Sequence, residues 1–353
     1  MVCLLFLSRT TTYIYKLDWY MLMAISSEAD FEKRVKDYKN YVNKIEQEIS
    51  KLVIGQHEAV RGFLRAIICN GHVLVEGVPG IGKTLLVNTL STITGCKFSR
   101  IQFTPDLLPS DIVGLTSYQR EEGFYTIKGP LFSNFVLADE INRAPPKVQS
   151  ALLEAMQERQ ATIGKETFEI TPPFFVLATQ NPIEHAGTYP LPEAQVDRFL
   201  FKILMKYPSM EDEQKILTTN IQIKKFKDYD LKKIISPNDI MRMQQDVQKV
   251  YLDPKLEKYI VSLVDCTRHP DKYKLKLGKY IDFGSSPRAS IGLYLASKAE
   301  AFINAKAFVT PQDIKKIAKD VLRHRIILNY EGQAEGISSD QIIEEILAKV
   351  PVP

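Results

Sequence analysis

The sequence has few cysteines, little net charge and no long apolar run near its start, and each shortage excludes a class of protein. Its four cysteines, Cys3, Cys69, Cys96 and Cys266, are scattered, with no C-x-x-C pair and no histidine at metal-ligand spacing. Neither a zinc site nor a disulfide framework is therefore expected, and a reducing cytoplasm fits best. The formal net charge of +4 over 353 residues gives no reason to expect a nucleic-acid partner without a local basic patch.

An apolar stretch at residues 2–7 is too short to cross a membrane, and no basic region precedes it. We interpret residues 1–28 as a disordered lead that results from an upstream start, with Met21 and Met23 as candidate initiators. A cryptic membrane anchor is the alternative interpretation. We expect no stable insertion into a membrane.

What the sequence does contain is a complete G-x-x-x-x-G-K-T pattern at residues 77–84. An apolar strand is predicted before it at residues 73–75, and a helix after it at residues 84–94. The backbone N–H groups of such a loop surround phosphate oxygens, Lys83 reaches the β- and γ-phosphates, and Thr84 offers a hydroxyl to Mg²⁺. The residues predicted to bind ATP here are Gly77, Pro79, Gly80, Ile81, Gly82, Lys83, Thr84 and Leu85.

Apolar periodicity divides the chain into an α/β part and a helical part. Amphipathic helices are predicted at residues 30–52 and 57–69, and further buried strands at residues 98–103, 134–138 and 174–178. After residues 207–209 strands nearly vanish. We therefore predict an α/β nucleotide-binding core at residues 29–208 and a smaller, all-α domain at residues 209–353, in which Ser236 and Thr310 begin two helices with capping boxes.

Two strand ends carry side chains suited to ATP hydrolysis. Asp139 and Glu140 follow one buried strand, which places Asp139 to hold Mg²⁺ with Thr84 and Glu140 to activate water. A merely polar strand end is the alternative. Asn181 ends the next strand, where its amide would lie near the γ-phosphate, although an Asn-Pro pair alone is also a common turn signal.

With these motifs the chain resembles the AAA+ ATPases, and within them the MoxR group, from about residue 54 to residue 336. The matching segments are residues 77–84, 108–114, 138–144, 152–156, 188–195, 197–199 and 286–289. The resemblance implies that Asn181 is sensor 1, that Arg198 is an arginine finger for a neighbouring subunit's ATP, and that Arg288 is sensor 2. It also implies that Ile54 and Gly55 border the adenine. Intramolecular salt bridges are the alternative for both arginines, and whether Arg288 acts in cis or in trans stays open.

The resemblance implies a P-loop AAA+ fold, a three-layer parallel sheet core followed by a helical lid, assembled as a ring that we expect to be a hexamer. An arginine supplied in trans would make hydrolysis depend on assembly. The function implied is that of a chaperone-like ATPase that remodels, matures or activates partner proteins, often ones with a von Willebrand factor A domain.

Two other functions remain open at this point. A nucleic-acid motor would use the basic, aromatic-containing stretches at residues 224–229 and 272–277, of which the second also fits a half-buried lid hairpin. A nucleotide-controlled switch would bind ATP with little turnover. Hairpins are predicted at residues 124–130 and 162–168. In related proteins such hairpins face the pore or the partner-binding rim, and ordinary surface hairpins are the alternative.

Overall fold

The computed structural model describes residues 30–78, 80–121, 123–181, 187–219 and 226–353. The predicted N-terminal lead, Pro79 of the phosphate loop, and Lys224 and Lys225 of the first basic stretch lie outside the described residues. None of the helices in the described ranges has the length and apolar character needed to cross a bilayer.

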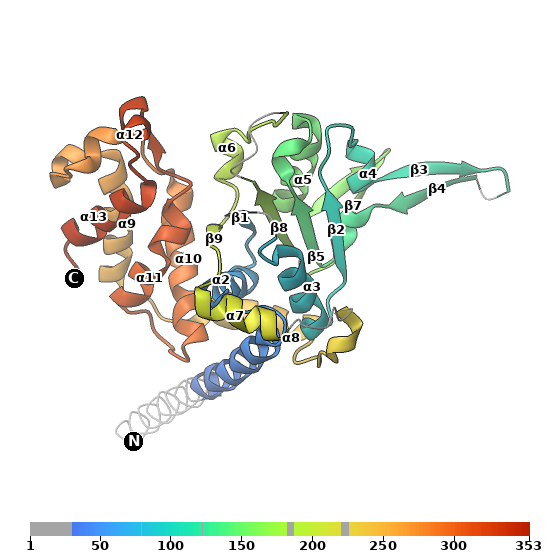
Figure 1. Cartoon of the computed structure of the whole chain (residues 1–353), viewed down its shortest axis with the longest axis horizontal. Coiled ribbons are helices and arrows are strands. Elements are labelled where there is room, and N and C mark those ends of the chain that lie inside the picture. The colour runs from blue at the N-terminus through green and yellow to red at the C-terminus, as the bar shows by residue number, and fades with distance from the viewer. Residues whose placement is uncertain (1–29, 79, 122, 182–186, 220–225) are drawn as a thin grey trace, which may run out of the picture.

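A five-stranded parallel sheet forms the centre of the core, in the order β2-β5-β8-β1-β9 (Figure 1). Its strands are β1 (Val73–Gly77), β2 (Phe98–Gln102), β5 (Phe135–Asp139), β8 (Phe175–Gln180) and β9 (Phe201–Met205). The first four confirm the predicted strands. The edge strand β9 was not predicted, and it pairs in parallel with β1 from Phe201 opposite Val73 to Met205 opposite Gly77.

Successive strand residues face opposite sides of this sheet, so two layers of helices cover it. Val73 and Val75 face the apolar cluster that includes α2 (His57–Ile68), α3 (Lys83–Thr94) and the N-terminal helix. Leu74 faces the other cluster, which is built with α4 (Pro109–Val113) and α5 (Pro146–Glu158). Both faces of a parallel sheet are normally buried in this way, and the predicted three-layer core is confirmed.

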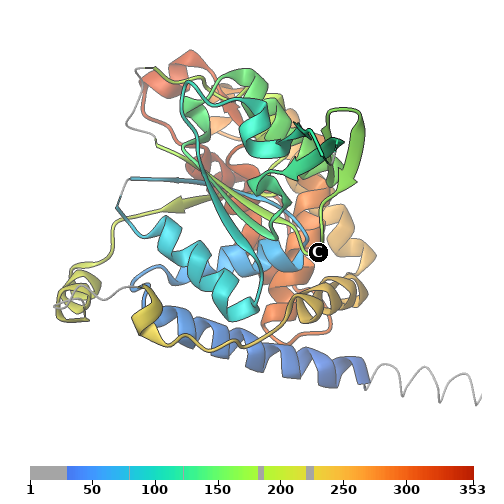
Figure 2. The same cartoon turned by 90° about the vertical axis from the view of Figure 1, so that its right-hand side faces the viewer.

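The N-terminal helix spans residues 30–50 in the described part of the chain and runs beneath the core (Figure 2). Its buried residues recur at helical spacing, as predicted: Phe31, Val35, Tyr38, Val42, Ile45 and Ile49. The hydroxyl of Tyr38 donates to Asp246 of α8 (Pro237–Asp246) at 2.9 Å, and its ring packs 5.1 Å from that of Phe302. This helix therefore ties the core to the helical part that follows it.

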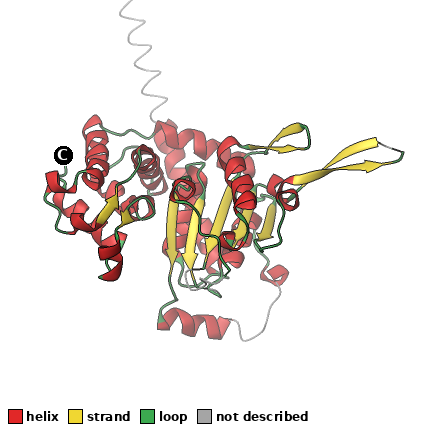
Figure 3. Ribbon diagram, turned by 90° about the horizontal axis from the view of Figure 1, so that it is seen from above, coloured by secondary structure: helices red, strands yellow, loops and turns green. Residues whose placement is uncertain are grey.

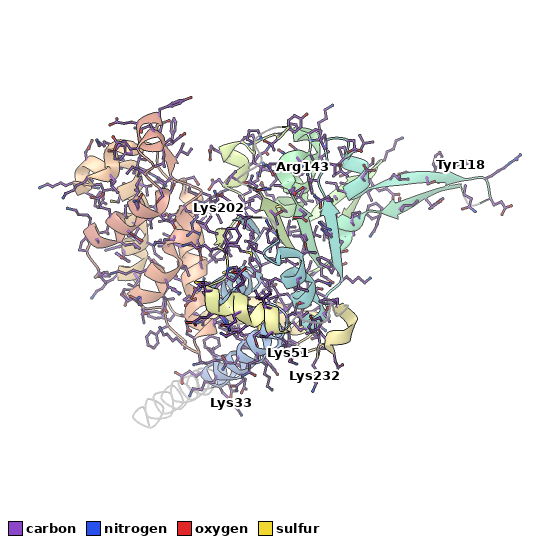
Figure 4. All side chains as sticks on the ribbon, in the orientation of Figure 1. Lys33, Lys51, Tyr118, Arg143, Lys202 and Lys232 are labelled. Atoms are coloured by element: carbon purple, nitrogen blue, oxygen red, sulfur yellow. The ribbon has the colours of Figure 1, made fainter. Side chains whose placement is uncertain are left out.

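Two antiparallel hairpins project from the core at the end away from the lid (Figure 3). One pairs β3 (Gly114–Gln119) with β4 (Gly123–Lys128), and the other pairs β6 (Gln160–Ile163) with β7 (Glu166–Glu169). The second confirms the hairpin predicted at residues 162–168, whereas the first begins earlier than predicted, because residues 124–130 contain only its second strand. The β3–β4 hairpin extends far from the body, and Tyr118 lies near its outer end (Figure 4). Its exposed large apolar side chains are Leu115, Tyr118, Phe124, Tyr125 and Ile127.

Helices dominate after β9. They are α7 (Met210–Thr219), α8, α9 (Pro254–Arg268), α10 (Pro287–Ile303), α11 (Pro311–Leu322), α12 (Tyr330–Ala334) and α13 (Ser339–Lys349). The predicted capping boxes at Ser236 and Thr310 are confirmed. A short antiparallel pair, β10 (Ile281–Phe283) with β11 (Ile327–Leu328), is added to these helices. The hairpin considered for residues 272–277 is wrong. Two short 3-10 turns, at residues 270–273 and 277–280, lie at the ends of this segment, and the N–H groups of Lys276 and Leu277 bond Glu345.

The lid is fixed to the β9 side of the sheet by buried charge as well as by apolar contacts. Arg65 of α2 is 1% exposed. Its Nε lies 2.6 Å from Glu300 of α10, and its Nη1 lies 3.4 Å from Asp320 of α11. Loss of one partner from such a buried pair is costly, because the remaining charge stays out of water without compensation.

Replacing Arg65 with Met should lower the free energy of unfolding by about 3–5 kcal/mol, since Glu300 would keep a buried charge without its cation. The matched control is Lys316→Met, which removes an exposed pair between the same two parts of the chain, Lys316 and Glu58 at 2.9 Å. That change should cost less than about 1 kcal/mol. Urea unfolding of both variants measures the difference, and equal losses would contradict the role given to Arg65.

Candidate active site

The phosphate loop connects β1 to α3, and its backbone is shaped by glycine. Gly80 and Gly82 have φ of 82° and 84°, values that side-chain-bearing residues rarely adopt. Gly82 directly precedes α3, so the helix N-terminus faces the loop with its free N–H groups. The ammonium of Lys83 donates to the carbonyl of Gly77 at 2.8 Å. Burial lowers the pKa of Lys83, while the nearby carboxylates of Asp139 and Glu140 oppose that change.

A cavity of about 430 Å³ lies against this loop. It gathers the ends of three neighbouring strands, as expected where the carboxyl ends of parallel strands meet. Its lining residues are Gly80, Gly82, Lys83, Thr84, Leu85, Arg100, Asp139, Glu140 and Asn181. The structure thus brings together the loop, both acids and the amide that the sequence indicated. Asn181 is 8% exposed.

A second cavity of about 390 Å³ adjoins the first and shares Gly80, Gly82 and Leu85 with it. Its walls are mainly apolar and come from Ile54, Ile81 and the start of α7, among others. This is the shape and chemistry that a nucleotide base requires next to a phosphate site. Gly55 does not line it. That residue, at φ 78°, lies against Asp212 of α7, whose carboxylate would be 3.0 Å from a Cβ placed on Gly55.

Thr179 of β8 holds the two acids in place. Its hydroxyl donates to Asp139 Oδ1 at 2.7 Å and accepts the N–H of Glu140 at 2.8 Å. Asp139 also forms an ion pair with Arg100 of β2 at 2.6 Å. Sequence reasoning missed both partners. Their only signal was that each lies in or near the end of a predicted strand, next to the strand that carries Asp139.

Glu140 is held by two side chains. Its Oε2 accepts from Gln102 Nε2 at 2.8 Å and from Arg143 Nη1 at 2.9 Å. Its backbone has φ of 58°, a left-handed value that is uncommon for residues other than glycine. The chain therefore turns sharply after Asp139. Figure 4 labels Arg143, which comes from the turn after β5.

Thr84 and Asp139 are the residues that could hold a metal ion in the phosphate cavity. A hydroxyl and a carboxylate are hard oxygen donors of the kind that Mg²⁺ prefers. Among the described residues no group of three or more histidine, cysteine or acidic side chains could hold a metal. Two protein ligands suit Mg²⁺, which commonly keeps several waters and takes oxygens from phosphates.

The two candidate arginines lie elsewhere. Neither Arg198 nor Arg288 lines either nucleotide cavity of its own chain, and both are exposed. Asp197 directly precedes Arg198 in the chain, and its Oδ2 is 3.7 Å from Arg288 Nη1. Arg288 thus forms a long, half-exposed ion pair with Asp197, which is the salt bridge considered as the alternative for this arginine. For Arg198, no ion pair is recorded within the described residues.

In the second basic stretch one lysine and the tyrosine are engaged, whereas Lys274 and Lys276 are exposed. Lys272 forms an ion pair with Asp265 at 2.9 Å, and the hydroxyl of Tyr273 donates to the same carboxylate. These hydrogen bonds, that from Lys272 first, lower the pKa of Asp265 to about 2. Lys272 and Tyr273 are therefore engaged with a neighbour in the lid, and this engagement weakens the case for a nucleic-acid motor.

Comparisons with known proteins agree with this geometry. The family described as "ATPase family associated with various cellular activities (AAA)" matches residues 72–201, and the "AAA lid domain" matches residues 278–346. Chaperone MoxR1 of Mycobacterium tuberculosis is 46% identical over 312 residues, which are 87% of this chain and 81% of that protein. The uncharacterized protein YeaC of Bacillus subtilis is 43% identical, over 90% of this chain and 96% of that protein.

A solved structure shows the same fold. The crystal structure of a candidate ATPase from Cytophaga hutchinsonii is similar with a TM-score of 0.85 and 50% identity. The match covers 91% of this chain and 98% of that one, so it includes the sheet, the phosphate loop and the lid together. The chain therefore belongs to the MoxR family of AAA+ ATPases, as its phosphate loop, its paired acids and these relatives show.

Proposed function

We propose that this chain hydrolyses ATP at the interfaces between identical subunits of a ring, with six subunits as the expected number. The observation that carries the proposal is the exposure of Arg198 and Arg288 beside Asp197, away from the phosphate cavity of their own chain. Phosphoryl transfer needs cations near the developing charge. In a ring, the arginines of one subunit would supply them to the cavity of the next.

The residues of the cavity divide the chemistry among them. The loop N–H groups and Lys83 bind the β- and γ-phosphates, and Asn181 orients the γ-phosphate and the attacking water. Glu140 accepts the proton of that water once its carboxylate leaves Gln102 and Arg143. Bound at Thr84 and Asp139, Mg²⁺ would neutralise phosphate charge. Ile54, which lines the second cavity, would flank the base.

We further propose that Arg288 acts in trans together with Arg198. Arg288 approaches the carboxylate of Asp197, the residue that immediately precedes Arg198, so both arginines are presented to the surroundings from one place. A sensor that reached the ATP of its own chain would line the phosphate cavity, and Arg288 does not. Intersubunit placement accounts for both arginines without any movement of the lid.

The work done by this cycle, in our proposal, is the remodelling, maturation or activation of a partner protein. The relative from Mycobacterium tuberculosis is named a chaperone. The β3–β4 hairpin supports a protein partner, because it presents exposed aromatic side chains far from the core. A partner with a von Willebrand factor A domain and a cytoplasmic setting belong to the same proposal. Among the described residues, free cysteines at Cys69, Cys96 and Cys266 are compatible with that setting.

Replacing Glu140 with Gln should leave ATP binding intact and reduce turnover by on the order of 100-fold or more, because an amide cannot take the proton of water. Phosphate release and the affinity for a fluorescent ATP analogue measure the two effects. Glu158→Gln is the matched control, since Glu158 is an exposed carboxylate at the end of α5 and outside the cavity. Substantial turnover in Glu140→Gln would assign the base to another residue.

Replacing Arg198 with Ala should lower turnover by on the order of 1000-fold while nucleotide affinity stays close to that of the unaltered chain. Mixing these subunits with Lys83→Ala subunits should restore part of the activity. The second variant lacks a working phosphate loop but keeps its arginines, so it completes the intact cavities of the first. Absence of recovery in mixed rings would show that Arg198 has no role in trans.

Mass measurement by light scattering, with and without ATP, tests the ring itself. Turnover per subunit should rise with assembly as the protein concentration increases. A monomer that binds ATP tightly and turns it over negligibly at all concentrations would support a nucleotide-controlled switch in place of the ring ATPase.

A further inference from the structure

Arg325 lies in the turn that follows α11, on the side of the lid that meets the sheet, and all five N–H donors of its guanidinium are engaged. Nε donates to Asp197 Oδ1 at 2.7 Å, and Nη2 donates to the carbonyls of Phe199 at 2.7 Å and Asp197 at 3.2 Å. Nη1 donates to the carbonyls of Leu200, at 3.2 Å, and Val321. Arg325 is 6% exposed. Its donors are thus used almost entirely on residues 197–200.

These acceptors bracket Arg198. The carbonyls of the residues before and after it, Asp197 and Phe199, are bound by the same nitrogen, Nη2 of Arg325. The carbonyl of Phe199 is also 3.0 Å from His324 Nε2. A carbonyl only accepts, so this nitrogen carries the proton, and burial keeps His324 neutral by lowering its pKa well below the usual range. The backbone at Arg198 is therefore held on both sides, while its side chain is exposed.

Asp197 joins the second arginine to the same point. Its Oδ2 accepts the hydroxyl of Ser286 at 2.8 Å and lies 3.7 Å from Arg288 Nη1. Its Oδ1 accepts from Arg325. Ser286 is also the N-cap of α10, and its hydroxyl accepts the N–H of Arg288 at 3.1 Å. One carboxylate thus connects the segment of Arg198, the helix start of Arg288 and the buried guanidinium.

We propose that Arg325 is the positioning residue of the intersubunit site. It fixes the backbone around Arg198 and, through Asp197, fixes the position of Arg288 relative to Arg198. This inference rests on the proposed function of the two arginines. Arg325 itself touches no nucleotide cavity of its own chain.

The neighbouring Arg323 provides the contrast. It is also mostly buried, but it bonds Asp320 and Asp340 within the lid and the carbonyl of Lys202 in β9. None of its recorded contacts lies in residues 197–200. Arg323 therefore attaches the lid to the sheet without reaching Arg198. Arg325, in contrast, holds the backbone on both sides of Arg198.

The test is Arg325→Lys in the full chain. A lysine presents three donors from one nitrogen and cannot span the oxygens that the planar guanidinium bridges. Turnover should fall by about 10- to 100-fold, the effect of displacing a catalytic group by about 1 Å, with little change in KM for ATP. Mixing with Lys83→Ala subunits should restore activity, because their own Arg198 is correctly held and the cavities of Arg325→Lys are intact.

Arg323→Lys is the matched control. It should lower the thermal midpoint to a similar extent and keep most of its turnover. If Arg325→Lys does not assemble, Asp197→Asn takes its place, since it keeps the size of the side chain and removes the charge; the same loss and the same rescue are expected.

An assembled variant with unaltered turnover would overturn the inference. So would a loss that Lys83→Ala subunits do not rescue although they rescue Arg198→Ala, and so would failure of both variants to assemble, because Arg325 would then be structural alone. If Arg198→Ala itself is not rescued, the proposed function fails, and with it the basis of this inference.

Discussion

Buried arginines hold the lid to one edge of the sheet, and the arrangement of the whole molecule follows from that attachment. Arg65 reaches from α2 to two acids of the lid, and Arg323 and Arg325 reach from α11 to β9 and the segment before it. A desolvated guanidinium tolerates little change in geometry, because separation from its acceptors leaves charge uncompensated. Several buried guanidinium contacts therefore hold the lid against the β9 edge. Among the described residues of the helical part, those of α7 contribute to the wall of the base cavity.

A single hydroxyl has a comparable influence within the phosphate cavity. Thr179 bonds the carboxylate of Asp139 and the backbone of Glu140, so the two acids are oriented by one group of the adjacent strand. The carboxylates nevertheless face different partners, Arg100 for Asp139 and Gln102 with Arg143 for Glu140. The candidate metal ligand, Asp139, is thus already held in place, whereas the candidate base, Glu140, must leave its present hydrogen-bond partners before it can bond water.

The parts of the structure that were predicted correctly are those that depend on continuous local sequence patterns. The phosphate loop lies between a buried strand and a helix, and Asp139, Glu140 and Asn181 directly follow apolar runs, so their meeting at one edge follows from parallel pairing. β9 was missed because it lies at the sheet edge, where Lys202 and Leu204 interrupt its burial. Alternating lysines suggested a hairpin at residues 272–277, but the backbone there is satisfied by Glu345 from a distant helix.

The residues that sequence reasoning missed have roles that arise only from tertiary contacts. Gln102 lies 38 positions from Glu140, and Arg325 lies 128 positions from Asp197. Neither forms part of a motif with a fixed spacing, and a polar residue at a strand end or a helix end has many ordinary explanations. Their neighbours across the sheet or the lid were needed to distinguish these explanations.

The placement of Arg198 and Arg288 outside the cavity of their own chain has a genetic consequence. In an assembly of the proposed kind, each subunit contributes the phosphate cavity to one site and the two arginines to another. A mutation of Arg198 or Arg288 would leave the phosphate cavity of the mutant subunit usable and inactivate the cavity of its neighbour. A mutation of the phosphate loop would inactivate the cavity of the mutant subunit and leave that of its neighbour usable. Alleles of the two kinds should complement each other in one cell, and either kind, expressed beside the normal gene, should interfere with it in a dominant manner.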